Sequence, residues 1–206
     1  MMGGYLWWYG NWSNRTISSA LPYTFIDDTK DARYNVFVSR MYASPLLEAL
    51  NSDLVVLFGC NPNVVGGNGG GQGTDLIRVR ENGARIIHID PRRTESTAGG
   101  QDEWIPIRPA TDAALCSALC YVMVKDEIAD FDFLNSHCVG FDETTMPEGA
   151  PEHASYLDYL MGTGYDMVEK TPEWAEEICG VPADRIRKLA HEICEAKACY
   201  IAQGDG

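Results

Sequence analysis

The chain has 206 residues, 45% of them hydrophobic, and carries a formal net charge of −14. A chain of this length and composition can bury a core, which distinguishes it from a disordered protein. The acidic balance argues against broad nucleic-acid binding, and no apolar run of 18 residues predicts a membrane-spanning helix. We therefore expect neither a nucleic-acid partner nor direct insertion into a membrane.

Residues 1–52 are predicted to form an irregular lead-in, with one helix near residues 44–51. Within it, Ser13 follows Asn11 and Trp12 and is a candidate turn residue, nucleophile or metal ligand. The four histidines lie far apart in the sequence, so a catalytic triad with this serine is not indicated.

Residues 53–206 are predicted to form an α/β domain that begins with two buried parallel strands, at 53–60 and 84–90. Both segments are short and apolar, and each is bounded by Gly or Pro. A glycine-rich loop at 66–73 and a helix at 74–82 lie between them. Together they make a βαβ unit, whose crossover should be right-handed. Ligands of such units bind at the loops that follow the carboxyl ends of the strands.

The remaining elements continue this pattern. A short strand is predicted at 104–107 and a long helix from Thr111 to about residue 124. A helical excursion follows at about 126–180, and the chain ends in a helix and a strand. The later elements are expected as helices at 131–138, 154–161, from 171, and at 182–196, and as a strand at 199–203. The whole predicts a three-layer α/β sandwich with a mostly parallel sheet.

Capping residues predict where several helices begin and end. Thr74 is the expected N-cap of the first long helix, and Gly83 follows its last turn. Thr111 is expected to cap the helix that starts beside it. Thr171 and Pro172 together form a favourable helix start, because proline suits the first helical position.

The loop after the first strand begins with Gly59, Cys60, Asn61 and Pro62. Glycine lets a ligand approach the backbone closely, and the Asn61 amide can bind a ligand or its own turn. The glycine-rich segment that follows matches neither a P-loop nor a nicotinamide fingerprint. The alternative interpretation is a flexible surface loop.

The loop after the second strand contains Asp90, Pro91, Arg92 and Arg93. The Asp90 carboxylate could accept hydrogen bonds from ribose or a guanine edge, or form an Asx turn with the next residues. The two arginines could hold phosphates, or they could be solvated charges. The arginines near both loops that could form a local phosphate patch are Arg78, Arg80, Arg85, Arg92, Arg93 and Arg108.

A third candidate segment contains Pro109, Thr111 and Asp112. Asp112 could bind a purine edge, or it could be a first-turn acid that the helix dipole favours. His88 lies inside an apolar strand and is predicted to be a core histidine.

Two cysteines, Cys116 and Cys120, share a helix face, and we predict that both are packed thiols. None of the seven cysteines forms a C-x-x-C pair, so the spacing of zinc or ferredoxin sites is missing.

Several stretches, taken in order, resemble the molybdopterin oxidoreductase family in its dimethyl sulfoxide reductase branch. The segments Ile89-Asp90-Pro91-Arg92-Arg93-Thr94 and 102–115 are the most specific to it. Further stretches with the same resemblance are 9–13, 57–62, 138–142, 170–175 and Gln203-Gly204. The resemblance covers nearly the whole chain.

This resemblance implies a bis-molybdopterin guanine dinucleotide cofactor with molybdenum. It implies that Ser13 ligates the metal as the catalytic residue, and that residues 53–206 are a domain that binds guanine dinucleotide. The family's usual Asp-Tyr before the serine is Asn-Trp here, and the substrate stays open. The residues expected to hold one arm of the cofactor are Gly59, Cys60, Asn61, Pro62, Asp90, Pro91, Arg92, Arg93, Pro109, Thr111 and Asp112.

The resemblance also implies that the chain is an internal fragment of a larger enzyme, inactive by itself. We expect the full-length enzyme to reduce a small molecule, such as an S-oxide or N-oxide. It should carry a [4Fe-4S] cluster, pair with an iron–sulfur electron-transfer subunit and a membrane anchor, and be exported. The alternatives are a nicotinamide-dependent dehydrogenase domain and a non-catalytic interaction domain.

Overall fold

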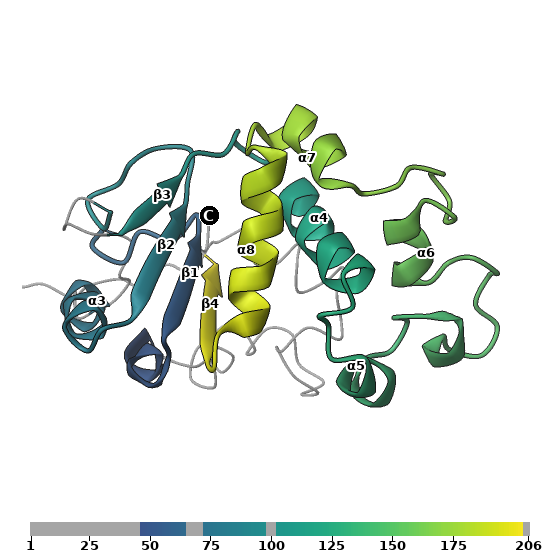
Figure 1. Cartoon of the computed structure of the whole chain (residues 1–206), viewed down its shortest axis with the longest axis horizontal. Helices are drawn as coiled ribbons and strands as arrows, with labels where there is room; N and C mark the ends of the chain where they lie inside the picture. The colour runs from purple at the N-terminus through teal and green to yellow at the C-terminus, as the bar shows by residue number, and fades with distance from the viewer. Residues whose placement is uncertain (1–45, 65–71, 98–101, 204–206) are drawn as a thin grey trace, which may run out of the picture.

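The computed structural model describes residues 46–64, 72–97 and 102–203 (Figure 1). Within these ranges, the strands form one four-stranded, all-parallel sheet in the order β3-β2-β1-β4. This confirms the predicted α/β class and the parallel sheet. The strands are β1 (Leu54–Phe58), β2 (Arg85–Ile89), β3 (Glu103–Ile105) and β4 (Cys199–Gln203).

Helices cover both faces of this sheet. Consecutive strand residues point to opposite sides, and both sides of β1 carry apolar side chains that need covering. Val55 and Leu57 of β1 pack with the 3-10 helix η1 and with α3, whereas Leu54 and Val56 pack with the layer of α4, α7 and α8. The predicted three-layer sandwich is therefore confirmed. The covering helices are η1 (Leu46–Asn51), α3 (Gln72–Glu81), α4 (Asp112–Lys125), α7 (Pro172–Cys179) and α8 (Ala183–Glu195).

The strand order reverses beside β1. The chain passes from β1 through α3 to β2 and β3 on one side, and β4 returns to the other side of β1. All four strands are parallel, so their carboxyl ends share one edge, which is the upper edge in Figure 1. Open α/β sheets bind ligands at this edge, next to the point of reversal.

Most of the predicted excursion, residues 126–170, lies beyond α4, away from the sheet (Figure 1), whereas its last helix, α7, packs in the layer that covers the sheet. The elements of residues 126–170 are α5 (Phe131–His137), the 3-10 helix η2 (Glu143–Thr145) and α6 (Tyr156–Met161). Lys170 is fully buried there, with its ammonium 2.8 Å from Asp166 and 4.2 Å from the centre of the Tyr159 ring. No helix of the described ranges has both the length and the apolar character needed to cross a bilayer.

Two of the predicted caps are wrong. The helix α3 begins at Gln72, so Thr74 lies inside its first turn. The Thr111 hydroxyl donates to the Arg108 carbonyl at 2.7 Å and makes no cap bond to α4. The other two predictions hold: Thr171 accepts from the Trp174 amide at 3.2 Å, and Gly83 has a φ of +94° just after α3.

The prediction of packed thiols is correct for one cysteine of the α4 pair only. Cys120 is half-buried, but Cys116 is exposed. 

Candidate functional site

The loop after β1 has an open backbone at its start and a buried amide behind it. Gly59 has a φ of +52°, and a β-carbon built on it would meet no atom within 4 Å. Its amide donates to the Ile89 carbonyl at 2.8 Å, which extends the pairing of β1 with β2. Cys60 is half-buried, and Asn61 and Pro62 are buried. The open position beside Gly59 is where a ligand could approach the chain.

Asn61 binds the neighbouring loop, which the sequence did not indicate. Its amide nitrogen donates to the Glu95 carboxylate at 3.1 Å, and its amide oxygen accepts from the Ser96 hydroxyl at 2.6 Å. Hydrogen bonding to the backbone amide of Glu95, followed by the bond from Asn61, lowers the pKa of the Glu95 carboxyl. Asn61 is therefore committed to joining the loops after β1 and β2.

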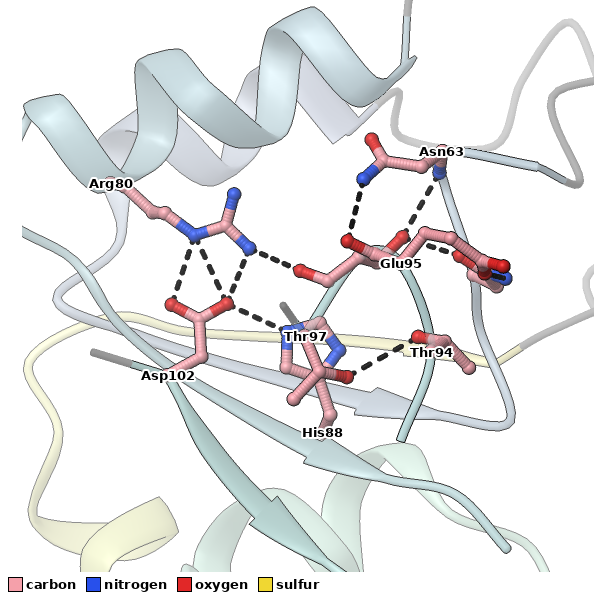
Figure 2. Close-up of polar contacts among 9 residues, drawn as sticks. Asn63, Arg80, His88, Thr94, Glu95, Thr97 and Asp102 are labelled. Carbon is pink, nitrogen blue, oxygen red and sulfur yellow. Dashed lines mark hydrogen bonds and ion pairs between the residues drawn. The ribbon is translucent and has the colours of Figure 1, made fainter. Parts of the chain in front are cut away.

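Asn63 reinforces this connection (Figure 2). Its backbone amide donates to the Ser96 hydroxyl at 3.0 Å, and its side-chain amide donates to the Glu95 carbonyl at 3.1 Å. A β-carbon on Gly73 would lie 2.3 Å from the Asn63 amide oxygen, so glycine lets the first turn of α3 come this close.

The residues on the β2 side of this connection were missed by the sequence analysis. Ser96 and Thr97 are fully buried, and the hydroxyl of Thr97 lies 3.2 Å from that of Thr94. The sequence signal was a run of four polar residues, 94–97, directly after the arginine pair. Polar runs of this kind usually predict an exposed turn, and only the fold buries this one.

Of the predicted β2-loop residues, Asp90 is half-buried, whereas Pro91, Arg92 and Arg93 are exposed. The Asp90 carboxylate accepts from the Arg92 amide at 2.9 Å, which is the Asx turn considered as an alternative, and this bond fixes its orientation. Arg92 is 67% exposed, with its guanidinium 3.8 Å from Glu95. Arg93 is exposed too, and nothing in the described ranges pairs with it. This turn therefore presents a carboxylate and two guanidinium groups at the carboxyl edge.

The predicted patch of six arginines is wrong for most of its members, because the fold supplies nearer partners. Arg80 pairs with Asp102, Arg85 binds Glu103 at 2.6 Å, and Arg108 donates to the Glu177 carbonyl at 2.5 Å. Arg78 lies 3.5 Å from Asp75 of its own helix. The arginines left for a phosphate are those of the β2 loop.

A buried charged network lies below the two loops, on the α3 face of the sheet. His88 is buried as predicted, but its Nε2 atom contacts the Asp102 carboxylate at 2.8 Å. Burial would raise the pKa of Asp102, yet the hydrogen bonds from His88 and Arg80 hold that pKa below its ordinary value. Asp102 is therefore an ionised carboxylate in a nearly water-free position.

The third candidate segment leads into α4, which starts at the same edge of the sheet (Figure 1). Pro109 is exposed, and Asp112 is half-buried in the first turn. No hydrogen bond within the described ranges joins Asp112 to either loop. The geometry suits both the purine-binding and the helix-dipole interpretation of this residue. Ser13 and the glycine-rich residues 66–71 lie outside the described residues.

One group of metal-ligand side chains occurs within the described ranges, on the excursion. It contains Glu143, His153 and Asp158, whose ligand atoms lie within 4.8 Å of one another. Their own hydrogen bonds account for the arrangement: the His153 amide donates to Glu143 at 3.0 Å, and the Ser155 hydroxyl donates to Asp158 at 2.5 Å. We assign no metal to it.

The loops after β1 and β2 suit the polar end of a nucleotide. Guanidinium groups bind phosphate oxygens, a carboxylate accepts from guanine or ribose, and a glycine backbone admits close contact. These groups meet at the edge where ligands of parallel sheets bind. Arg92 and Arg93 are the positively charged groups of this turn that could bind a phosphate in a chain of net charge −14.

Comparisons with known proteins identify the family. Residues 10–134 match the family described as molybdopterin oxidoreductase. The chain is 47% identical to dimethyl sulfoxide reductase DmsA of Escherichia coli over 99% of its length, and 28% identical to trimethylamine-N-oxide reductase of Vibrio vulnificus over 96%. It spans about a quarter of the length of these relatives, 24% and 23% respectively.

The fold is also similar to that of a solved structure. Acetylene hydratase from Pelobacter acetylenicus superposes with a TM-score of 0.54 at 27% identity. The match covers 75% of this chain and 18% of that protein.

Proposed function

This chain belongs to the molybdopterin oxidoreductase family, and we propose that it binds one arm of bis-molybdopterin guanine dinucleotide within a larger oxidoreductase. The reaction proposed for the whole protein is the two-electron reduction of an S-oxide or N-oxide, with transfer of an oxygen atom. The names of the relatives support this substrate class, since they include dimethyl sulfoxide and trimethylamine-N-oxide reductases.

The observation that carries the proposal is that hydrogen bonds join the loops after β1 and β2 at the carboxyl edge of the sheet. Ser96 and Glu95 bind Asn61 and Asn63, so the two loops form one surface instead of two separate turns. Preformed loops lose little conformational entropy when a ligand binds, which favours tight retention of a large cofactor.

Each loop residue has a distinct part in this proposal. Arg92 and Arg93 bind the pyrophosphate through their guanidinium groups, and Asp90 accepts hydrogen bonds from the guanine edge or a ribose hydroxyl. Gly59 admits the ligand to the backbone of the β1 loop. Asn61 holds the loops together, because both its amide oxygen and its amide nitrogen already have partners.

The remaining candidates complete the proposed site. Cys60, Pro62 and Pro91 shape the two loops, while Pro109, Thr111 and Asp112 form its third side, with the Asp112 carboxylate toward the purine. We propose Ser13 as the molybdenum ligand. When bound, the cofactor supplies a two-electron redox centre at the metal and an electron path through the pterin.

For the whole protein we propose a [4Fe-4S] cluster, an iron–sulfur partner subunit, a membrane anchor and an exported location. The chain alone is expected to lack turnover, because the other half of the cofactor cage belongs to the rest of such an enzyme.

The test uses the full-length protein, produced anaerobically with molybdate. Molybdenum is measured by elemental analysis, and guanine nucleotide is measured after acid hydrolysis. We expect both in the unmodified protein, a large loss of both in Asp90→Ala with Arg92→Ala and Arg93→Ala, and no loss in Arg78→Ala. Absence of molybdenum and guanine nucleotide from the unmodified protein would overturn the proposal.

The serine is tested separately in the same preparation. Replacing Ser13 by Ala should abolish turnover while guanine nucleotide stays bound. Unchanged turnover would remove Ser13 from the mechanism and favour a non-catalytic role for this part of the chain.

A further inference from the structure

The Arg80 side chain connects the sheet to the turn that follows β2. Its Nε atom donates to both oxygens of Asp102, at 2.9 and 3.0 Å, and its Nη2 atom also contacts that carboxylate. The same Nη2 donates to the Ser96 carbonyl at 2.5 Å. One guanidinium thus binds a carboxylate before β3 and a backbone carbonyl after β2 (Figure 2).

The carboxylate that anchors Arg80 is itself held from a second side. Asp102 is 4% exposed and receives the hydrogen bond from His88, a buried residue of β2. Because β2 is packed on both faces, the ring has little freedom to move. Asp102 therefore sets the position of the guanidinium, and the guanidinium sets the position of the Ser96 carbonyl.

Ser96 passes this constraint to the loop after β1. Its hydroxyl donates to Asn61 and accepts from the Asn63 amide. The same residue is bound by Arg80 through its backbone and binds the β1 loop through its side chain. A continuous series of hydrogen bonds therefore runs from the middle of the sheet to both loops at its carboxyl edge.

We infer that Arg80 is a positioning residue for the nucleotide site, acting through Ser96 on the loops that carry Gly59, Asp90 and Arg92. The inference rests on the proposed function, because it concerns how those loops hold guanine dinucleotide. Arg80 does not touch the ligand. It keeps the two loops in the geometry that binds the ligand, so that little ordering is needed on binding.

An arginine suits this role better than a lysine. A planar guanidinium can bind both carboxylate oxygens and the carbonyl together, whereas an ammonium group is a single point charge. Arg80→Lys therefore keeps the charge that pairs with Asp102 but loses the simultaneous bond to Ser96. The loop after β2 should therefore become more mobile while the fold remains intact.

The experiment measures cofactor loss from the full-length holoenzyme at a temperature well below its unfolding. Arg80→Lys should raise the rate constant for guanine dinucleotide loss about tenfold, as expected for losing a hydrogen bond to a charged group. Arg78→Lys, two residues earlier on the same helix, should leave the rate unchanged. A wild-type rate in Arg80→Lys would overturn the inference.

A second comparison separates positioning from general destabilisation. In an Asp90→Ala background, Arg80→Lys should add less than twofold, because the contact that it positions is already gone. Effects that multiply in the double variant would overturn the inference, since independent destabilisation is additive in free energy.

Asp102→Asn serves if Arg80→Lys does not fold, with the same expectation and the same overturning results. If the unmodified protein carries neither molybdenum nor guanine nucleotide, the proposed function itself fails and the inference fails with it. If the unmodified protein is loaded and Arg80→Lys behaves like it, the inference alone fails.

Discussion

Asp102 directly precedes β3 and Glu103 is its first residue, and these two neighbours anchor charged networks on opposite faces of the sheet. Asp102 faces α3, where it binds Arg80 and His88. Glu103 faces α8 and binds Arg85 and Arg185, at 2.6 and 2.7 Å. The alternation of side chains along a strand thus sends two neighbouring carboxylates to different layers.

The two networks differ in their contact with water. The carboxylates differ most: the Asp102 side chain is 4% exposed and that of Glu103 is 33% exposed. Arg80 is 19% exposed, and the two arginines that bind Glu103 are 45% exposed for Arg85 and 16% for Arg185. Coulomb interactions strengthen as water is excluded, and a buried charge that loses its partner is costly. Solvated ion pairs contribute little. The Asp102 network should therefore control the loops, while the Glu103 network only fastens α8 to the sheet.

The largest expected effect comes from removing the buried carboxylate. Asp102→Ala leaves the Arg80 charge and the His88 ring without their shared partner, and should lower the local free energy of opening of β2 by about 3 kcal/mol. Amide hydrogen exchange of the β2 peptides in the full-length protein measures this. A loss below about 1 kcal/mol would contradict the contrast between the two networks.

A smaller loss of stability is expected at Ser96, the residue that Arg80 binds. Ser96→Ala removes the hydroxyl that binds Asn61 and Asn63, leaving two polar groups unsatisfied, and should cost about 1–2 kcal/mol. Hydrogen exchange should increase in both loops together, at 61–64 and at 94–97. Ser136→Ala, on the exposed helix α5, is the matched control. Increased exchange in only one loop would mean that Ser96 does not join them.

Glu103→Ala should have a weaker effect than either change. Arg85 keeps access to water, and both Arg85 and Arg185 keep the Glu192 carboxylate as a partner, so the loss should be at most about 1 kcal/mol. The exchange rates of the α8 peptides should rise, and those of the two loops should not. A rise in the loops would show that the faces of the sheet are coupled.

The smallest expected effect is on pH dependence. The pKa of Asp102 in the folded protein lies below its ordinary value of 3.8, so its contribution is complete well above pH 3.8 and is lost as the pH falls through the folded value. Between pH 6 and pH 4 this carboxylate should account for at most about 0.3 kcal/mol of destabilisation, the limit set by its ordinary pKa of 3.8. Hydrogen exchange of β2 at the two pH values should show the difference, and Asp102→Asn should lack it. An equal pH effect in the variant would exclude Asp102 as the source.

Much of the secondary structure could be predicted from local patterns. The apolar segments at 54–58 and 85–89 form the expected strands, and Thr171 with Pro172 begins α7 where capping rules place it. The failed cap at Thr111 has a local cause, since its hydroxyl turns back to the Arg108 carbonyl. A capping rule does not predict whether a threonine hydroxyl binds a helix amide or a preceding backbone carbonyl.

The site could be predicted only in part. Parallel strands end at a common edge, so the two loops were expected to be neighbours, and the structure brings them together. Which arginines remain available depends on partners distant in sequence: Arg80 meets Asp102, and Arg85 meets Glu192. No local pattern contains those pairings.

The fold class, the strand positions and the family could be read from the chain alone, because periodicity, turn residues and ordered motifs are local properties. Only the tertiary structure decided that Ser96 and Asp102 are buried and that their hydrogen bonds join the two loops. The physical reason is that burial and pairing depend on which layers of the sandwich meet. Residues far apart in sequence, such as Arg80 and Asp102, become partners only when α3 packs on the sheet.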